Sequence, residues 1–167
     1  VVAGGTNFPG APLWQGGRKA WHDTVYGLAS AGSAWQVLGR LSRPLAYGVS
    51  VSTPQSLLCA GGSDAQTHYP DVFLLHAGNA ALTLEALPPL PRPVAYGCGA
   101  LVGRVFYVAG GLEAPAASQS LRNFWALDLD AKPGRWRELE PWPGPARMLS
   151  VAAAHAGAFY LFSGCEL

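Results

Sequence analysis

Charged residues are scarce in this chain, because Lys, Arg, Asp and Glu make up 13% of its 167 residues and leave a formal net charge of +1. Nucleic-acid-binding domains usually carry a basic patch, and anionic membrane surfaces attract clustered Lys and Arg. No uninterrupted apolar stretch is long enough to span a bilayer. We therefore expect neither nucleic acid nor a membrane among the partners of this protein.

Motifs for metals and organic cofactors are also missing. The three cysteines, Cys59, Cys98 and Cys165, form no Cys-x-x-Cys pair, and the four histidines show no His-x-His or His-x-x-x-His spacing. Zinc sites usually show such closely spaced ligands. The phosphate-binding loop, the Gly-x-Ser-x-Gly nucleophile motif and the Gly-x-Gly-x-x-Gly dinucleotide motif do not occur either. The sequence thus predicts no metal site and no cofactor, and Cys59 and Cys98 are expected to be small buried thiols within strands.

Glycine, in contrast, is abundant, and the pair Gly-Gly recurs after short apolar runs. The pair closes the runs VVAGG, LLCAGG and FYVAGG at Gly5, Gly62 and Gly111, and FYLFSG has Ser163 in place of the first glycine. Successive sites are 49 to 57 positions apart. A period near fifty, built on an apolar strand and a diglycine, is typical of kelch-type propeller blades.

Three further elements recur in a fixed order between the diglycine sites. One begins at Trp35, Leu84 and Trp136, has Leu or Trp at every third position and ends at a proline. Another reads DTVY, DVF and NFW after the diglycine loops, and the last reads AYGVSV, AYGCGAL and RMLSVAAA after the prolines. Four elements per repeat correspond to the four strands of one blade. The sequence therefore predicts an all-β fold, a kelch-type β-propeller.

The repeat divides the chain into four successive parts. Residues 1–44 are expected to form a blade without its first strand, and residues 45–93 and 94–145 to form complete blades. Residues 146–167 supply the first two strands of a further blade. Because propellers close with about four to eight blades, we expect a fragment of roughly half a propeller, with the missing half as its structural partner.

One face of such a propeller is expected to carry the functional site. Since the strands of a blade alternate in direction, the loops between second and third strands open beside the connections between blades. These loops are 6–22, 63–70, 112–122 and one beginning at Cys165. The substrate-binding candidates on them are Asn7, Trp14, His22, Asp64 and His68.

The loop 6–22 is long for a compact domain and contains Trp14 and Trp21. Loops of this length are usually functional or disordered, and two tryptophans argue against disorder. Aromatic rings beside polar side chains suit a sugar, because a sugar has apolar faces and a polar rim. The alternative is that both tryptophans pack against the blade without touching a ligand.

Arg147 is a further candidate for the site. Aligning the prolines of the three connections places Arg147 level with Ala46 and Ala95, at the top of the innermost strand. From there the guanidinium could point into the channel mouth and bind a carboxylate in bidentate fashion; the alternative is a loop ion pair. Asp23 and Asp71, which begin third strands, are expected to bond to the backbone of the blade turn.

Several longer phrases of the chain are more distinctive than the diglycine. They read AGGTNFP, WQGGRKAWHD, RPLAYGVSV, GALVGRVFYVAGG, NFWALDL, PWPGPARM and FYLFSG. Together they resemble the cyclically permuted mutarotase family, bacterial kelch-repeat relatives of the sialic acid mutarotase, also called N-acetylneuraminate epimerase. The resemblance spans essentially all 167 residues and implies a six-bladed propeller with a permuted blade order.

The resemblance implies an isomerase that interconverts the anomers of N-acetylneuraminate, or a related keto sugar, without metal or cofactor. In such chemistry a base removes the anomeric hydroxyl proton and an acid protonates the ring oxygen. The family uses an arginine for the sugar's carboxylate, and Arg147 in PGPARM matches that segment. Its proposed catalytic glutamate follows an Asn-Gly pair that is absent here, so the main acid/base is expected outside these residues, and Glu113 is the catalytic candidate within them.

Two interpretations of the function stand side by side. In the first, the full-length protein is a mutarotase for a small-molecule sugar, and residues 1–167 alone are inactive. In the second, a non-catalytic kelch propeller binds a protein or a glycan through its loop face. An acidic residue facing Arg147 across the channel would favour the enzyme. The sequence does not distinguish a periplasmic from a cytoplasmic location.

Overall fold

The computed structural model describes residues 1–78 and 82–167 and consists mainly of antiparallel β-sheets. Two sheets have four strands each, in chain order. The first contains β6 (Val49–Ser52), β7 (Leu57–Ala60), β8 (Val72–Ala77) and β9 (Leu82–Leu87). The second contains β10 (Cys98–Val102), β11 (Val105–Ala109), β12 (Phe124–Asp128) and β13 (Trp136–Glu138). The predicted all-β class is confirmed, with four-stranded sheets consistent with kelch blades.

Smaller sheets flank these two. A three-stranded sheet contains β1 (Val2–Ala3), β4 (Thr24–Gly27) and β5 (Gln36–Arg40). A hairpin of β2 (Thr6–Asn7) and β3 (Ala20–Trp21) has the 3-10 helix η1 (Leu13–Gln15) at its tip, and β14 (Val151–His155) pairs with β15 (Ala158–Phe162). Each sheet lies within one of the ranges 1–44, 45–93, 94–145 and 146–167; that each range is one propeller blade stays a prediction.

The main core lies between the two four-stranded sheets. Leu58 of β7, Phe106 of β11 and Trp125 of β12 are almost completely buried there. Trp125, Ala126 and Leu127 are buried in succession, so both faces of β12 are covered, as its short continuous apolar run predicts. A smaller cluster joins β4 to β8 through Val25 and Leu75.

The diglycine repeat ties each sheet to the connection that follows it. The equivalent backbone bonds run from Gly5 N to Leu45 O, from Gly62 N to Val94 O and from Gly111 N to Arg147 O. Gly61 and Gly62 have φ of +65° and +104°, in the left-handed region that favours glycine. A Cβ on Gly61 would lie 2.2 Å from the Val94 carbonyl oxygen. Glycine therefore recurs at these positions for two physical reasons: the left-handed backbone angle and the close approach of the carbonyl oxygen from the next connection.

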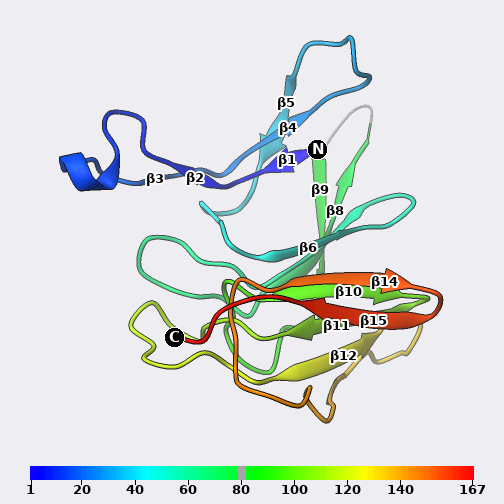
Figure 1. The fold of residues 1–167 in the computed structure, drawn as a ribbon. Helices are drawn as coiled ribbons and strands as arrows, with labels where there is room; N and C mark the ends of the chain where they lie inside the picture. The colour runs from blue at the N-terminus through cyan, green and yellow to red at the C-terminus, as the bar shows by residue number, and fades with distance from the viewer. Residues whose placement is uncertain (79–81) are drawn as a thin grey trace.

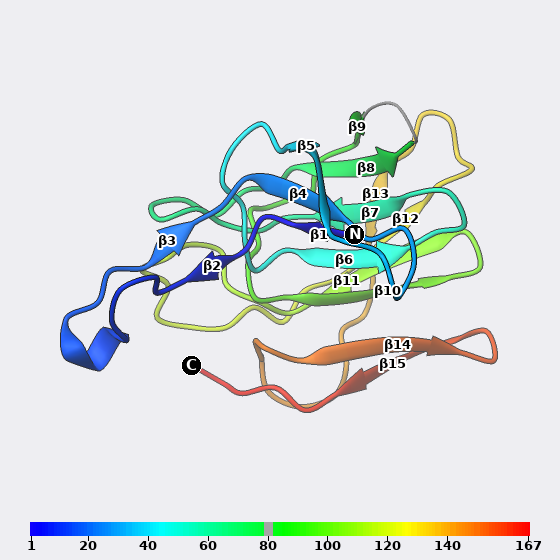
Figure 2. The ribbon, with the colours of Figure 1, turned by 90° about the horizontal axis from the view of Figure 1, so that it is seen from above.

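The sheets are arranged with their first strands β6, β10 and β14 side by side, as Figures 1 and 2 show. The hairpin β2–β3, the loop after β7, the loop after β11 and the C-terminal residues all lie on the left in Figure 1. The turns β6–β7, β10–β11 and β14–β15 lie at the opposite end. Loops that are far apart in the sequence are thus gathered at one end of the molecule.

Two of the cysteines lie within strands as expected, and Cys98 is buried whereas Cys59 is only partly buried. Cys59 is in β7 and Cys98 is in β10, and neither forms a disulfide. Burial raises the pKa of both thiols to about 11, so both are protonated at neutral pH. They act as small apolar side chains.

Candidate functional site

A cavity of about 360 Å³ opens at the end where the loops gather. Three loops and the starts of two inner strands form its walls. The lining residues are Trp21, Ser63, Asp64, Ala65, His68, Tyr96, Leu112, Pro115, Met148 and Leu149. Of the candidates predicted from the sequence, Asp64 and His68 are brought together here.

His68 is the most buried polar side chain that can titrate in this cavity, with 5% of its surface exposed. Its Nδ1 lies 2.9 Å from the carbonyl oxygen of Leu112. Because a carbonyl only accepts hydrogen bonds, Nδ1 carries the proton and Nε2 presents a lone pair. Burial lowers the pKa of His68 below 6.5, although the bond to Leu112 partly opposes this shift. His68 is therefore a neutral imidazole at neutral pH.

Ser63 lies beside His68 and is 1% exposed. Its backbone is fully engaged, since it donates to the Ala46 oxygen at 2.7 Å and accepts from the Ala46 nitrogen at 2.9 Å. Its Oγ, however, has no hydrogen-bond partner among the residues that the structure describes. A buried hydroxyl without a partner costs about 1–3 kcal/mol. A ligand hydroxyl entering the cavity could recover that energy.

Asp64 shapes the loop that carries Ser63 and His68. One carboxylate oxygen accepts from the backbone nitrogens of Gln66 and Thr67, both at 2.8 Å, and the other accepts from the Tyr69 hydroxyl at 2.5 Å. The Tyr69 bond comes first among the causes that lower the pKa of Asp64. The carboxylate is thus ionised at neutral pH and engaged in holding the loop closed.

Tyr47, Tyr96 and Leu149 form a backbone ladder across the starts of the inner strands. Tyr96 N donates to the Tyr47 oxygen at 2.8 Å, and Leu149 N donates to the Tyr96 oxygen at 2.9 Å. All three have positive φ, of 59°, 59° and 56°. A bulky residue in this region costs about 1–3 kcal/mol and is often found at functional sites. The two tyrosine rings stack with centroids 4.4 Å apart. The ring centroids of Tyr96 and His68 lie 5.9 Å apart in an edge-to-face arrangement.

The Tyr47 hydroxyl sits between two groups of the first hairpin. Lys19 Nζ donates to it at 2.9 Å, and Thr6 Oγ1 lies 3.0 Å away. These bonds, with that from Lys19 the largest cause, lower the pKa of Tyr47. Burial, in contrast, raises the pKa of Tyr96. The sequence interpretation missed Tyr47, Tyr96, Lys19 and Ser63, although the repeated phrase AYG and the position after the diglycine were visible signals.

The remaining hairpin candidates lie outside the cavity lining. His22 Nε2 and Asn7 Oδ1 are 2.9 Å apart, and both residues are exposed. Trp14, at the tip in η1, is 84% exposed. Trp21 instead lines the cavity and contacts the Tyr47 ring edge-on at 5.6 Å. The two tryptophans of this loop therefore have different environments.

Arg147 does not occupy the position expected from the proline alignment. The bridges Ala46–Ser63, Ala95–Leu112 and Met148–Cys165 are equivalent, so Met148 is level with Ala46 and Ala95, and that predicted alignment was wrong by one residue. The reason is an extra residue between the proline and the inner strand of the third connection. Arg147 Nη1 donates to the Ser163 oxygen at 3.0 Å, and its guanidinium lies 5.8 Å from the Trp142 ring centroid. Arg147 is not among the residues that line the cavity.

Glu113 is also outside the cavity lining. Its carboxylate lies 3.7 Å from Arg92 Nη1, and both side chains are about half exposed. The loop after β11 contributes Leu112 and Pro115 to the cavity instead. Glu113 therefore does not share the cavity lining with His68 and Asp64.

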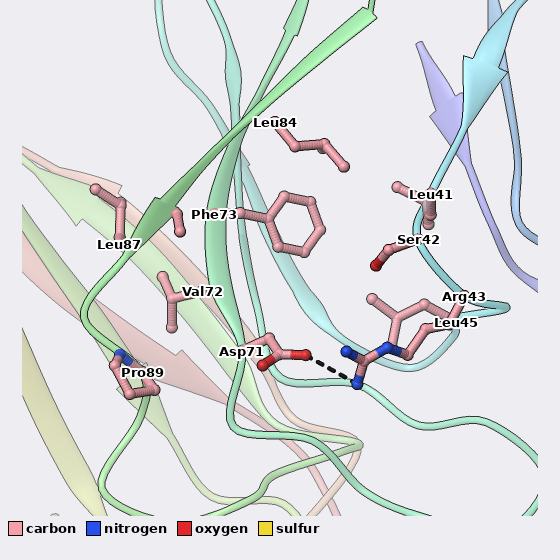
Figure 3. A pocket seen from close by; sticks show the side chains of 11 residues that line it. Leu41, Ser42, Arg43, Leu45, Asp71, Val72, Phe73, Leu84, Leu87 and Pro89 are labelled. Carbon is pink, nitrogen blue, oxygen red and sulfur yellow. Dashed lines mark ion pairs between the residues drawn. The ribbon is translucent and has the colours of Figure 1, made fainter.

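A second hollow of about 360 Å³ lies between the β1–β4–β5 sheet and the β6–β9 sheet (Figure 3). The side chains of Phe73, Leu84 and Leu45 face it. At its edge, Arg43 Nη1 and Asp71 Oδ2 form an ion pair of 3.0 Å. Asp23 likewise pairs with Arg40 at 2.6 Å. The predicted side-chain bonds of these aspartates to the backbone were wrong, because arginines lie within reach. The hollow is therefore a mainly apolar groove between the two sheets.

Within residues 1–78 and 82–167, no group of three or more His, Cys, Asp or Glu side chains is placed to hold a metal ion. None of the helices in the described part of the chain has the length and apolar character needed to cross a membrane.

Curated proteins similar to this chain carry the name N-acetylneuraminate epimerase. The protein of Brucella suis is 41% identical over 95 residues, covering 51% of this chain and 24% of the relative. That of Yersinia pestis is 41% identical over 73 residues, covering 37% and 18%, and that of Salmonella enteritidis is 40% identical over 75 residues, covering 40% and 19%. The chain is thus partly homologous to these proteins and matches about a quarter of their length or less. No protein-family model matches the chain.

Proposed function

We propose that the chain is part of a sugar mutarotase that interconverts the anomers of N-acetylneuraminate or a related keto sugar. The partial homology supports the substrate class, because the relatives are named N-acetylneuraminate epimerase. The observation that carries the proposal is the cavity, in which the Ser63 hydroxyl has no hydrogen-bond partner among the described residues and His68 presents its Nε2 lone pair.

The cavity offers both kinds of contact that a sugar needs. Trp21 and Tyr96 provide aromatic surface for the apolar faces of the ring. Ser63 Oγ can donate or accept, and the unprotonated Nε2 of His68 can accept, so sugar hydroxyls would find partners of both types. Its volume of about 360 Å³ lies within the range of small-ligand sites.

A negatively charged sugar also needs a cation. Lys19 Nζ lies 5.7, 5.5 and 5.1 Å from the ring centroids of Phe8, Trp21 and Tyr47, and it forms no ion pair with the described residues. Neither Lys19 nor Arg147 lines the cavity itself. We assign the sugar's carboxylate to Lys19, because its Nζ lies 5.5 Å from the ring centroid of Trp21, which lines the cavity, whereas the guanidinium of Arg147 lies over Trp142, which does not.

The hairpin candidates complete the proposed site as an outer wall. Asn7 and His22 would contact substituents that extend beyond the cavity, and Trp14 would close over them only by movement of the hairpin tip. Glu113 would have to leave Arg92 before it could transfer a proton. The ranges 1–44, 45–93, 94–145 and 146–167 are proposed as successive blades of the propeller that supports this site.

Anomer exchange tests the proposal directly. Proton NMR follows the approach of freshly dissolved N-acetylneuraminate to its anomeric equilibrium, with and without catalytic amounts of the full-length protein. Faster equilibration that is lost in Lys19→Met supports a mutarotase with its carboxylate site on the hairpin. Absence of acceleration, with related keto sugars also tested, would contradict it.

A binding module without catalysis is the second candidate. It is favoured by the tip of the hairpin, where Trp14 is 84% and Leu13 is 67% exposed, since exposed apolar clusters often mark interaction sites. Saturable sugar binding without faster anomer exchange would favour this function over the enzyme.

A further inference from the structure

We infer that His68 is a catalytic residue of the proposed mutarotase, with Nε2 accepting the anomeric hydroxyl proton of the sugar and Ser63 Oγ hydrogen-bonding to the reacting oxygens. The inference rests on the proposed function and names the proton-transfer group of its cavity. Neither Glu113 nor Arg147 lines this cavity.

The geometry fixes which nitrogen can react. Nδ1 is committed to the Leu112 carbonyl at 2.9 Å, a group that cannot donate, so the proton stays on Nδ1. Nε2 forms no hydrogen bond with the residues that the structure describes, and the ring lines the cavity. A histidine with one nitrogen held by a fixed acceptor is oriented for proton transfer at the other nitrogen.

Ser63 is the independent observation that points to a ligand. Its side chain is 1% exposed, and its Oγ has no partner among the described residues, whereas its backbone bonds to Ala46 are made. The backbone of Ser63 also pairs with that of His68 across the loop. Two buried polar side chains with free hydrogen-bonding atoms are thus held next to each other on the same cavity wall.

The other titratable groups of the cavity do not compete for the proton near neutral pH. Asp64 is held ionised by the Tyr69 hydroxyl and by two backbone nitrogens, which lower its pKa. Tyr96 has its pKa raised by burial and stays a neutral phenol. Among the lining side chains, His68 is therefore the one expected to change charge on moderate acidification.

The reaction balances with this single group. Nε2 takes the proton of the anomeric hydroxyl, the anomeric carbonyl forms, and the bond from the anomeric carbon to the ring oxygen breaks with its electron pair moving to that oxygen. The imidazolium then returns the proton from Nε2 to the ring oxygen, which leaves as a hydroxyl. Both oxygens share one carbon, so one nitrogen can reach both. Attack of the same hydroxyl on the other carbonyl face reverses the steps and gives the other anomer.

The first test uses the full-length protein without substitutions, which is the unaltered protein of the comparisons below. Long-range proton–nitrogen NMR correlations are expected to show His68 protonated at Nδ1 and unprotonated at Nε2, with a pKa below 6.5. Saturating N-acetylneuraminate is expected to shift the Nε2 signal, and the rate of anomer exchange is expected to fall on acidification with the same midpoint as the titration of His68. An Nε2–H tautomer, or a rate that does not change across this titration, would overturn the inference.

Variants give the second test. In His68→Asn, the side-chain amide can still donate to Leu112 while the Nε2 position is removed. The turnover rate is expected to fall about 10²- to 10⁴-fold, whereas Ser63→Ala is expected to lower it only about two- to tenfold. His155→Asn, at an exposed position at the opposite end of the sheets, is the matched control and keeps its activity.

The outcomes separate the inference from the proposed function. If the unaltered protein accelerates no anomer exchange, both are overturned. If it does so and folded His68→Asn retains the same rate and pH dependence, the inference alone is overturned. Circular dichroism of His68→Asn checks the fold, and the pH–rate profile of the unaltered protein decides the matter if that variant does not fold.

Discussion

The loop 63–70 and the hairpin 6–22 both begin directly after a diglycine pair, yet their polar side chains differ in burial. The short loop buries Ser63 and His68 with a hydroxyl and a ring nitrogen that have no hydrogen-bond partner in the described part of the chain. The long hairpin exposes Trp14 and pairs Asn7 with His22. Length and aromatic content thus favoured the hairpin as a binding site, whereas the buried polar groups lie in the short loop.

The difference follows from packing. The short loop is fixed to its neighbours, since Ser63 bonds to the backbone of Ala46 and His68 bonds to the carbonyl oxygen of Leu112. The hairpin tip is held mainly by its own turn, where Gln15 and Gly16 bond back to Pro12 and Leu13. A loop fixed to neighbouring sheets can hold unpaired polar groups in place, whereas a projecting hairpin exposes its side chains to water.

The largest expected effect concerns a glycine at the base of the short loop, compared with a glycine at the tip of the hairpin. Gly61→Ala should destabilise the protein by more than about 2 kcal/mol, because it adds a left-handed strain of about 1–2 kcal/mol to a Cβ that meets the Val94 oxygen at 2.2 Å. Gly16→Ala, at φ +79° with open space around it, should cost only about 1 kcal/mol. Urea unfolding measures both. Equal losses would mean that the close approach of Gly61 to the Val94 oxygen adds nothing to the backbone strain.

The two tryptophans of the hairpin provide the next comparison. Trp21→Ala should weaken binding of N-acetylneuraminate about tenfold, since a buried aromatic contact contributes about 0.5–1.5 kcal/mol beyond its area. Trp14→Ala should change neither stability nor sugar binding beyond about 0.5 kcal/mol, because the side chain is 84% exposed. Calorimetric titration with the sugar checks both variants. A stronger effect of Trp14→Ala on binding would place the sugar-binding site at the hairpin tip instead.

The free energy of unfolding at acidic pH tests whether His68 is buried in the short loop. Burial lowers the folded-state pKa of His68 below 6.5, so the unfolded chain binds the proton more readily. Its contribution to stability is full above pH 6.5 and is lost as the pH falls through the lowered folded-state value. Unfolding free energies measured along a descending pH series should therefore fall less steeply in His68→Asn. An unchanged slope in that variant, with His155→Asn as the matched histidine deletion, would show that His68 is not buried as described.

The smallest effect concerns the phenols where the hairpin meets the inner strands. Lys19 and Thr6 lower the pKa of Tyr47, and burial raises that of Tyr96. Ultraviolet titration of phenolate should thus show Tyr47 ionising before Tyr96, and Lys19→Met should move the Tyr47 step to higher pH. Tyr47→Phe identifies the step. Coincident titration of both tyrosines would mean that Lys19 does not hold the Tyr47 hydroxyl in solution.

Much of the fold could be predicted because the repeat records local geometry. The diglycine marks the end of each second strand, and the apolar runs mark strands that are covered on both faces. Ser163 fits the same site because it adopts φ of 54°, in the left-handed region. The strands predicted from each element agree with those observed.

The candidate site was predicted only in part. Asp64 and His68 were placed on the correct loop, since loop membership follows from strand order. Arg147 was misplaced, because one extra residue in the third connection leaves its carbonyl bonded to Gly111 and puts Met148 at the start of the inner strand. An alignment of prolines cannot detect this shift, whereas a backbone hydrogen bond fixes it.

The strand order, the all-β class and the face on which the loops gather all follow from the sequence pattern, because they depend on periodicity and on glycine's backbone freedom. Which side chains meet depends instead on how the sheets pack. The hydrogen bond from His68 to Leu112 and that from Lys19 to Tyr47 join residues that are distant in the chain. The burial of Ser63 Oγ without a partner among residues 1–78 and 82–167 likewise results from the packing around it. Such contacts depend on how neighbouring sheets pack, and no local pattern of residues encodes that packing.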